Sequence, residues 1–227
     1  MQVLVVAAHH DDEVMGCGGT IERHAAAGDQ VHLLIMADGV TSRDDPGLAT
    51  SGLEYRNDAC RAAANILGIS TVQQLGYPDN AMDTLPLLEV VKQVESVVRR
   101  ILPHTIYTHH LGDLNIDHRL THEAVITACR PQPDECVRRI LTFEVLSSTE
   151  WQSPSHRSPF VPNHFVEITA HSHTKLKALN CYQAEMRDYP HSRSFQSVEA
   201  LSRFRGASVG VEMAEAFMVI RDLQFDT

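Results

Sequence analysis

The stretch Val3–His24, VLVVAAHHDDEVMGCGGTIERH, joins an unbroken apolar run to two histidines, two aspartates and a glutamate. The residues QVLVVAA at 2–8 are apolar and rich in β-branched side chains, which predicts a strand buried on both faces of a parallel sheet. A glycine-rich turn then leads into helical spacing at 18–29, which Gly28 closes. The polar residues therefore lie where a strand ends and a helix follows.

Strand and helix patterns continue to alternate along the chain. Strands are predicted at 30–39, 71–77, 104–109 and 138–147, and helices at 53–69, 85–102 and 117–130. Thr84 is the expected N-cap of the helix at 85–102. This alternation predicts an α/β fold, a Rossmann-like and mostly parallel sheet with helices on both faces.

The last third of the sequence is less regular. Residues 147–162 are rich in serine and proline and predict a long irregular loop. A strand at 164–169, helices at 174–189 and 198–207 and a closing strand at 215–222 follow. A length of 227 residues is common for one α/β unit, so residues 1–227 are expected to form a single domain.

The composition of the chain argues against some classes of function and favours others. The formal charge of -10, with both signs interspersed, argues against a nucleic-acid partner, and no apolar run reaches the roughly 18 residues of a membrane span. The first residues lack the features of a signal peptide, which predicts a cytoplasmic protein. Five cysteines without CxxC spacing are expected to be free thiols. Fourteen histidines, several near carboxylates, favour metal chemistry.

Two polar clusters follow predicted strands. The first is AHHDDE at 8–13, and the second is THHLGDLNIDHRLTH at 108–122. In an open α/β sheet ligands bind outside the carboxyl ends of the strands, so the clusters can face each other across one crevice. Histidine and aspartate are zinc ligands, and a catalytic zinc site uses three protein ligands and leaves a position for water. The segment GCGGT does not match GxGxxG, which argues against a dinucleotide loop.

These motifs carry a family resemblance. AHHDDE resembles the AHPDDE signature of the PIG-L/LmbE-like zinc-dependent N-deacetylases, with His10 in place of the proline. DLNIDH is similar to the second motif of that family, which ends in Asp-His. GYPDN, YPHSRS and AEAF resemble segments of a bacterial branch, so the resemblance covers nearly the whole chain. It implies one Rossmann-like domain in which the C-terminal helical part, 170–210, helps to cover the site.

The resemblance also implies roles for five residues. His9, Asp12 and His118 would hold the metal, and Asp11 would be the general base. Asp117 would orient or tune a catalytic imidazole from outside the ligand set. This division has a physical basis, because a metal lowers the pKa of its water and a second carboxylate takes the proton during attack on the amide.

The second motif departs from the family at Asn115. Many members have a histidine three residues before the ligand, which can act as an acid or oxyanion partner, whereas asparagine can donate a hydrogen bond but supplies no proton. The acid is then either Asp11, recycling its proton, or His191 in YPHSRS. A solvated loop histidine is the alternative interpretation of His191.

Substrate contacts are predicted at four positions besides Asn115. Arg56 either faces the ligand or forms a surface salt bridge, and Asp79 either accepts bonds from sugar hydroxyls or forms a turn after Pro78. Arg193 suits an anionic group such as a phosphate. Trp151 either stacks on a sugar or anchors its loop.

Other polar residues of the clusters allow two interpretations each. Without a second motif, HxDDE also fits acidic residues that favour the start of a helix. His10 either contacts substrate or is a bystander at the mouth, and Glu13 is expected to accept hydrogen bonds near the turn. His122 lies one helical turn after the second-motif ligand, where we expect a structural rather than a ligating role. Of His109 and His110, at most one should face the crevice.

The predicted function is hydrolysis. The resemblance implies a Zn²⁺-dependent enzyme that removes an N-acetyl group from an amino sugar or its nucleotide-, lipid- or antibiotic-linked conjugate, although His and Asp ligands also accept iron or cobalt. Its partner would be that small N-acetylated sugar, and a homo-oligomer is also allowed. The alternatives are an amidase for another small molecule, such as a thiol conjugate, and a metal- or sugar-binding protein without turnover.

Overall fold

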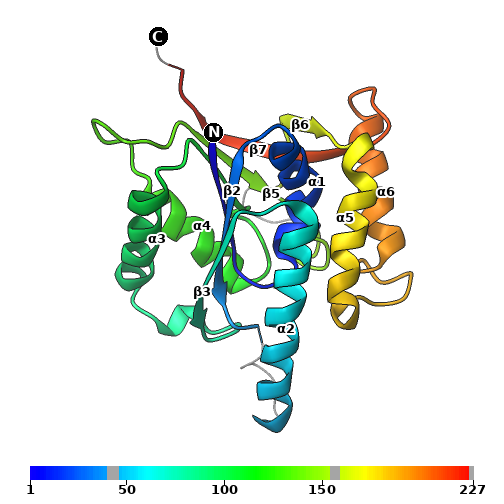
Figure 1. The fold of residues 1–227 in the computed structure, drawn as a ribbon, viewed down its shortest axis with the longest axis horizontal. Coiled ribbons are helices and arrows are strands. Elements are labelled where there is room, and N and C mark those ends of the chain that lie inside the picture. Colours follow the sequence, from blue (N-terminus) through cyan, green and yellow to red (C-terminus); the bar gives the residue numbers. More distant parts are fainter. Residues whose placement is uncertain (40–45, 154–158, 225–227) are drawn as a thin grey trace.

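A twisted sheet forms the middle of the protein (Figure 1). The structure is a computed structural model that describes residues 1–39, 46–153 and 159–224. Within these residues the sheet has seven strands in the order β3-β2-β1-β4-β5-β7-β6. The strands are β1 (Gln2–Ala7), β2 (Gln30–Ala37), β3 (Thr71–Tyr77), β4 (Thr105–His109), β5 (Arg139–Phe143), β6 (His164–Glu167) and β7 (Ala214–Asp222). Neighbours among β1–β5 pair in parallel, whereas β7 is antiparallel to β5 and β6. The predicted fold class is confirmed.

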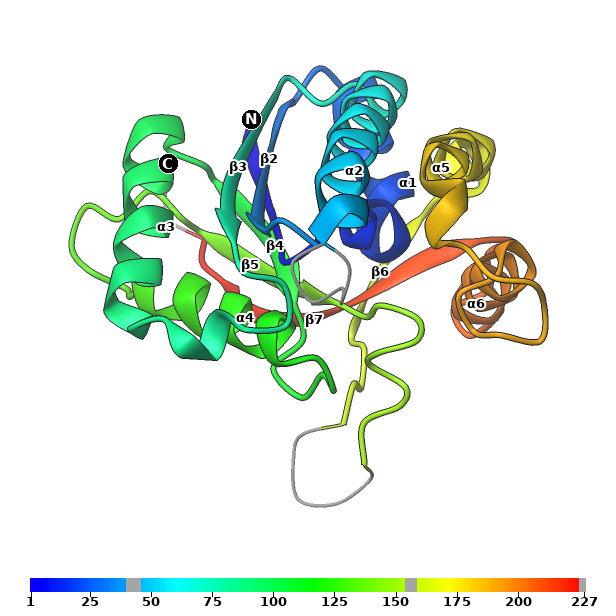
Figure 2. The same ribbon diagram turned by 90° about the horizontal axis from the view of Figure 1, so that it is seen from below.

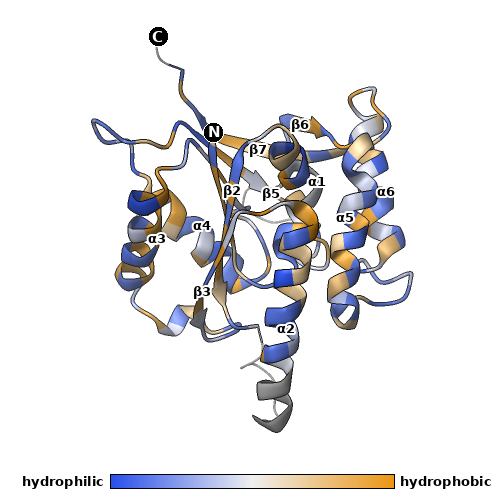
Figure 3. Ribbon diagram, in the orientation of Figure 1, coloured by the Kyte–Doolittle hydropathy of each residue, from blue (hydrophilic) through white to orange (hydrophobic). Residues whose placement is uncertain are grey.

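Helices cover both faces of this sheet (Figure 2). One face carries α3 (Leu87–Ile101) and α4 (Ile116–Ala128), and the other carries α1 (Asp12–Ala26), α2 (Pro46–Leu67), α5 (Ser172–Leu179) and α6 (Phe195–Ala207). Alternate residues of β1 enter separate hydrophobic clusters: Val3 and Val5 pack toward α1 and α2, while Leu4 and Val6 pack toward α3 and α4. Burial on both faces explains the unbroken apolar run, and Figure 3 shows the apolar residues gathered along the strands.

The beginning of α1 differs from the prediction. The helix begins at Asp12 rather than at Gly18, and Asp11 precedes it in the left-handed conformation, with φ 88°. The glycines therefore lie inside the helix, where they allow close packing. A Cβ at Gly16 would overlap the ring of Phe143, so a side chain there would force the helix away from the sheet.

Two further local predictions are wrong. Thr84 does not cap α3, because it ends a 3₁₀ turn and its hydroxyl donates to Ala81 O, while Pro86 precedes the helix without a side-chain cap. The helix expected at 174–189 ends at Leu179 and continues as a 3₁₀ segment, Asn180–Glu185, in which Tyr182 leaves helical geometry. Burial of that tyrosine ring in the core competes with regular helix continuation.

Other expectations agree with the structure. Residues 147–153 and 159–162 form no regular strand or α-helix, as predicted for the loop, whose residues 154–158 lie outside the described part. All five cysteines are free. Among the described residues, no helix is both long enough and apolar enough to span a membrane.

The strand order places a crevice beside β1 and β4. From β1 the chain runs outward to β2 and β3 in one direction, and β4 and β5 continue in the other. Such a reversal opens a crevice at the carboxyl ends of the strands. His9 and Asp12 follow β1, and His118 follows β4 on α4, so the two polar clusters meet at this point.

Candidate metal and active site

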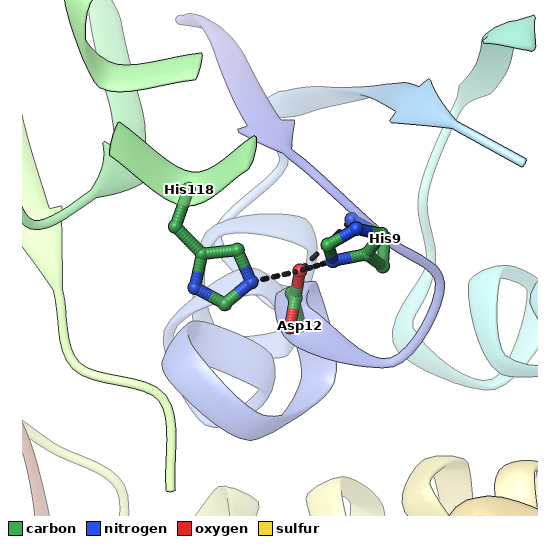
Figure 4. A group of neighbouring side chains, drawn as sticks. All are labelled: His9, Asp12 and His118. Atoms are coloured by element: carbon green, nitrogen blue, oxygen red, sulfur yellow. Dashed lines mark hydrogen bonds and ion pairs between the residues drawn. The ribbon is translucent and has the colours of Figure 1, made fainter. Parts of the chain in front are cut away.

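Three donor atoms converge at the crevice (Figure 4). Asp12 Oδ2 lies 3.4 Å from His9 Nδ1 and 3.2 Å from His118 Nε2. All three residues are buried, and their ligand atoms lie within 4.8 Å of one another. Asp12 Oδ1 has no hydrogen-bond partner among the described residues, which leaves acceptor capacity inside the cluster. This mixed nitrogen and oxygen set fits a divalent cation.

An outer carboxylate fixes the first imidazole. His9 Nε2 donates to Asp117 Oδ2 at 2.9 Å, which leaves Nδ1 directed toward Asp12. Asp117 also accepts from the backbone N–H of Asn80 at 2.7 Å and of Met82 at 3.1 Å. A carboxylate on the far nitrogen of a ligating histidine sets its tautomer and orientation.

A second outer carboxylate, Asp113, was missed by the sequence interpretation. Its Oδ1 lies 3.1 Å from His118 Nδ1. Asp113 also accepts hydrogen bonds from the hydroxyls of Ser148 and Thr149. Asp113 is the first residue of DLNIDH, and its place in this motif was the sequence signal that could have identified it. Its two hydroxyl partners come from the long loop, which no local pattern links to this motif.

Opposite charges outweigh burial in this cluster. Burial lowers the pKa of His118, but the carboxylates of Asp12 and Asp113 raise it to about 9. Burial likewise opposes the raised pKa of His9, which is bonded to Asp117 and Asp12. Burial would raise the pKa of Asp12, yet the neighbouring histidines hold it well below its usual value. Without metal, a protonated His118 therefore lies beside an ionised Asp12.

Asp11 lies beside the converging donors but is held separately. Its side chain is buried, and Oδ2 accepts a hydrogen bond from Arg193 Nη1 at 3.0 Å. Burial raises the pKa of Asp11 to about 6, and the charge of Arg193 opposes that rise. Arg193 is fixed in turn by its Nε, which donates to Ser147 Oγ at 3.1 Å.

The two residues left open in the first motif are both buried. Glu13 Oε1 accepts from the Tyr182 hydroxyl at 2.7 Å, as expected for an acceptor at this turn, and burial raises its pKa to about 8. His10 is 1% exposed and lies inside the protein rather than at an open mouth. Its burial and the nearby Arg56 charge lower its pKa to about 4, so this imidazole is neutral.

Two of the predicted substrate residues lie within the crevice region. Arg56 is buried and pairs through Nη2 with Glu185 Oε2 at 2.6 Å, so its ion pair is not a surface salt bridge. Asp79 is also buried, and its Oδ1 lies 3.2 Å from His9 Nε2. Their contacts to a sugar stay predictions.

Asn115 has a structural task that the sequence interpretation did not assign. It is the N-cap of α4, where its Oδ1 accepts from Asp117 N at 2.8 Å. Its Nδ2 donates to Asn80 Oδ1 at 2.9 Å. These bonds hold the second motif in place, and any contact with substrate stays a prediction.

The C-terminal turn reaches the site through Arg193 rather than His191. His191 is exposed, and its ring contacts the Trp151 ring edge-on, with ring centroids 5.6 Å apart. Its Nδ1 accepts the backbone N–H of Arg193 at 3.0 Å, which leaves Nε2 as the nitrogen that can exchange a proton with solvent or substrate. The acid role of His191 stays a prediction.

The remaining histidines of the second cluster face different directions. The His109 ring stacks on the His118 ring, with ring centroids 3.9 Å apart. The His110 ring instead contacts the Phe160 ring edge-on, with ring centroids 5.3 Å apart. Only one of the two therefore joins the site, as strand alternation predicts. His122 Nδ1 donates to His109 O at 2.8 Å, and this residue is absent from the converging donor set.

Comparison with known proteins places this architecture in a family. The model of the family PIG-L, GlcNAc-PI de-N-acetylase, matches residues 4–129, which include both polar motifs. The chain belongs to the PIG-L family. PIG-L deacetylases are metal-dependent, which accords with the His and Asp cluster.

Several relatives of this PIG-L chain carry deacetylase names. It is 28% identical to an uncharacterized deacetylase, YaiS, of Escherichia coli K12, over 80% of this chain and 90% of that protein. It is 26% identical to a probable N-acetyl-alpha-D-glucosaminyl L-malate deacetylase 2 of Bacillus anthracis, over 81% and 80%. N,N'-diacetylchitobiose deacetylase from Pyrococcus horikoshii shares the fold, with a TM-score of 0.79, 23% identity and coverage of 97% and 84%.

Proposed function

We propose that this protein is a metal-dependent hydrolase that removes the N-acetyl group of an amino sugar or amino-sugar conjugate. The main observation behind this proposal is the buried carboxylate of Asp11, which lies beside the three converging donors of His9, Asp12 and His118. A protein that only held a metal would not need this additional carboxylate. PIG-L membership and the deacetylase names of the relatives support the same reaction.

We assign the metal to His9, Asp12 and His118, and zinc is the cation that we propose. Three protein ligands with nitrogen and oxygen donors are typical of catalytic zinc sites. Such a cation supplies Lewis-acid polarisation of the amide carbonyl and makes water more acidic. Asp117 and Asp113 orient the two imidazoles, as the hydrogen bonds to their far nitrogens support.

Asp11 is the general base in this proposal. It takes a proton from water as the water oxygen bonds to the acetyl carbon, and the carbon–nitrogen bond then breaks. The nitrogen leaves as an amine after receiving a proton, either from Asp11 itself or from His191. Arg193 holds Asp11 in place and keeps positive charge beside the developing oxyanion.

Substrate contacts are proposed at Arg56, Asp79, Asn115 and Arg193. Their position around the donor set supports this assignment for sugar hydroxyls and for an anionic group of the conjugate. We also propose a cytoplasmic location, which the five free thiols support because they suit a reducing compartment. Assembly into a homo-oligomer stays a prediction that light scattering checks.

Weakening the second outer carboxylate should weaken metal binding. We expect Asp113→Asn to lower zinc affinity by about tenfold or more, because its amide group cannot accept from His118, Ser148 and Thr149 as a carboxylate does. Titration of the metal-free protein against a competing chelator measures this change. Asp58→Asn, at an exposed position of α2, is the control. Equal affinities for both variants would contradict the proposed role.

Zinc binding should depend steeply on pH. The metal-free protein carries a proton on His118 at pH 7, since its pKa is about 9, and His9 has a raised pKa as well. Zinc must displace these protons, so its apparent affinity should rise by at least about tenfold per pH unit between roughly pH 6 and 8. Calorimetry in buffers of different ionisation enthalpy measures the protons released. A pH-independent affinity would refute the protonated state.

The same pKa has a consequence for the metal-free fold. His118 has a higher pKa in the folded protein than the roughly 6.5 of an unfolded histidine. Its contribution to stability is therefore fully present below about pH 6.5 and is lost as pH rises through about 9.

The proposed reaction is tested by acetate release. N-acetylated sugars, free and linked to nucleotides, lipids or antibiotics, are incubated with the zinc-loaded and the chelated protein. We expect at least one substrate to yield equal amounts of acetate and free amine only with metal. No release from the whole panel would instead favour an amidase for another small molecule or a binding protein.

A further inference from the structure

The helix that begins at the metal site is broken in the middle. Within α1, Cys17 has non-helical dihedral angles, φ -149° and ψ 24°, and separates Asp12–Gly16 from the remainder of the helix. The short first segment carries Asp12 and follows Asp11, and the longer second segment continues from the kink to Ala26. The angle at this kink therefore sets how the segment that carries Asp12, and follows Asp11, is oriented on the rest of the helix.

A buried ion pair occupies the kink. In a regular helix, Gly19 N would donate to Met15 O. Here Gly19 N donates to Glu215 Oε1 at 2.9 Å, Lys175 Nζ donates to the same oxygen at 2.6 Å, and Lys175 Nζ also donates to Met15 O at 2.9 Å. The other oxygen, Glu215 Oε2, accepts from the N–H and the hydroxyl of Thr20. Lys175 and Glu215 thus bridge Met15 O and Gly19 N, the two groups that one hydrogen bond of a regular helix joins directly.

Burial makes this arrangement costly for stability alone. Lys175 and Glu215 are each 4% exposed, and two buried charges lose most of their hydration. An apolar pair of similar volume is often as stable as a buried ion pair, so stability gives no sufficient reason for charges here. The charged groups do provide fixed partners for backbone groups on both sides of the kink.

We propose that Lys175 and Glu215 form a positioning pair that sets the kink of α1 and thereby holds Asp12 and Asp11 in reach of the other site residues. Lys175 comes from α5 and Glu215 from β7, so two elements outside the metal-binding motifs clamp the helix. Glu215 is the glutamate of AEAF, a segment to which the proposed reaction assigns no other role. The proposal concerns the geometry of the donor set and, as regards catalysis, rests on the proposed function.

The principal test is a neutral double variant, Lys175→Met with Glu215→Gln. It removes both buried charges together, so neither is left unpaired, and it removes the ammonium group that donates to Met15 O. We expect a folded protein whose zinc affinity falls by about tenfold, with kcat lowered and KM for the sugar little changed. Zinc affinity and kcat within twofold of the parent would overturn the proposal.

A matched ion pair supplies the control. Arg205 and Glu144 line the same small cavity as Lys175 and Glu215. Arg205 Nε and Nη2 donate to the two carboxylate oxygens of Glu144, each at 2.7 Å, and in the described part of the chain neither residue bonds to α1. Arg205→Met with Glu144→Gln should lower thermal stability without changing zinc affinity or kcat. A similar loss of zinc affinity in this control would identify a general packing effect and overturn a specific positioning role.

A measurement on the unaltered protein avoids any failure of the variants to fold. Coupling between two sites is reciprocal, so zinc bound at Asp12 should stabilise the kink. Hydrogen exchange of the Gly19 and Thr20 amides should slow by about tenfold or more on zinc addition, beyond any change in α3. No selective slowing would overturn the inference. Because this readout and the zinc titrations need no substrate, they are decided separately from the proposed deacetylation.

Discussion

Asp11→Asn should lower kcat for deacetylation by about 10³-fold while zinc stays bound. Loss of a positioned general base typically costs about 10²–10⁴-fold in rate, and asparagine cannot take the proton of the attacking water. Asparagine is the suitable replacement because it tolerates the left-handed backbone at this position, where φ is 88°. Single-turnover acetate release and metal analysis of the same sample measure both quantities.

The control measurement for this variant is its zinc affinity. Asp11 is not part of the three-residue donor set, so zinc affinity should change far less than kcat. Arg193→Met, which removes the cation held by Asp11, should leave the base present and cost less activity than Asp11→Asn. Full activity of metal-loaded Asp11→Asn would refute the assignment of the base.

Removing one imidazole donor should abolish metal-dependent activity. We expect His118→Ala to lower zinc affinity by more than about 100-fold, because only two of the three proposed ligands remain. Acetate release should then fall to the level of the chelated parent. A zinc titration and an activity assay over a range of added zinc measure these effects.

His122→Ala is a closely matched control on the same helix. His122 lies one turn further along α4, is also a buried imidazole, and bonds to His109 O instead of Asp12. We expect its zinc affinity to stay within a few fold of the parent. If His122→Ala lost zinc as completely as His118→Ala, the ligand set would have to include both histidines of this helix.

The fold was predictable because its signals are local. The apolar β-branched residues of β1 and the alternation of strands and helices define a parallel sheet without reference to distant contacts. The start of α1 was not predictable in the same way. The glycine-rich segment after the polar residues predicted a turn and a helix from Gly18, and that pattern gives no sign of the left-handed Asp11 after which the helix begins at Asp12.

The same distinction applies to the candidate site. The convergence of His9, Asp12 and His118 follows from two motifs placed at neighbouring strand ends. The surroundings of these residues depend on tertiary contacts instead. Asp113 gains its partners from Ser148 and Thr149 across the long loop, and Arg193 reaches Asp11 from a turn 182 positions later. Such pairings do not arise from periodicity or composition.

The position of β7 has a consequence for how the protein is made. Glu215 reaches the amide of Gly19 across a separation of 196 positions, and β7 inserts between β5 and β6. As long as β7 has not emerged from the ribosome, the amides of α1 that bind Glu215 therefore lack their native partner. Contacts so distant in sequence favour slow folding. We expect the first helix to reach its native shape only after nearly the whole chain has been synthesised.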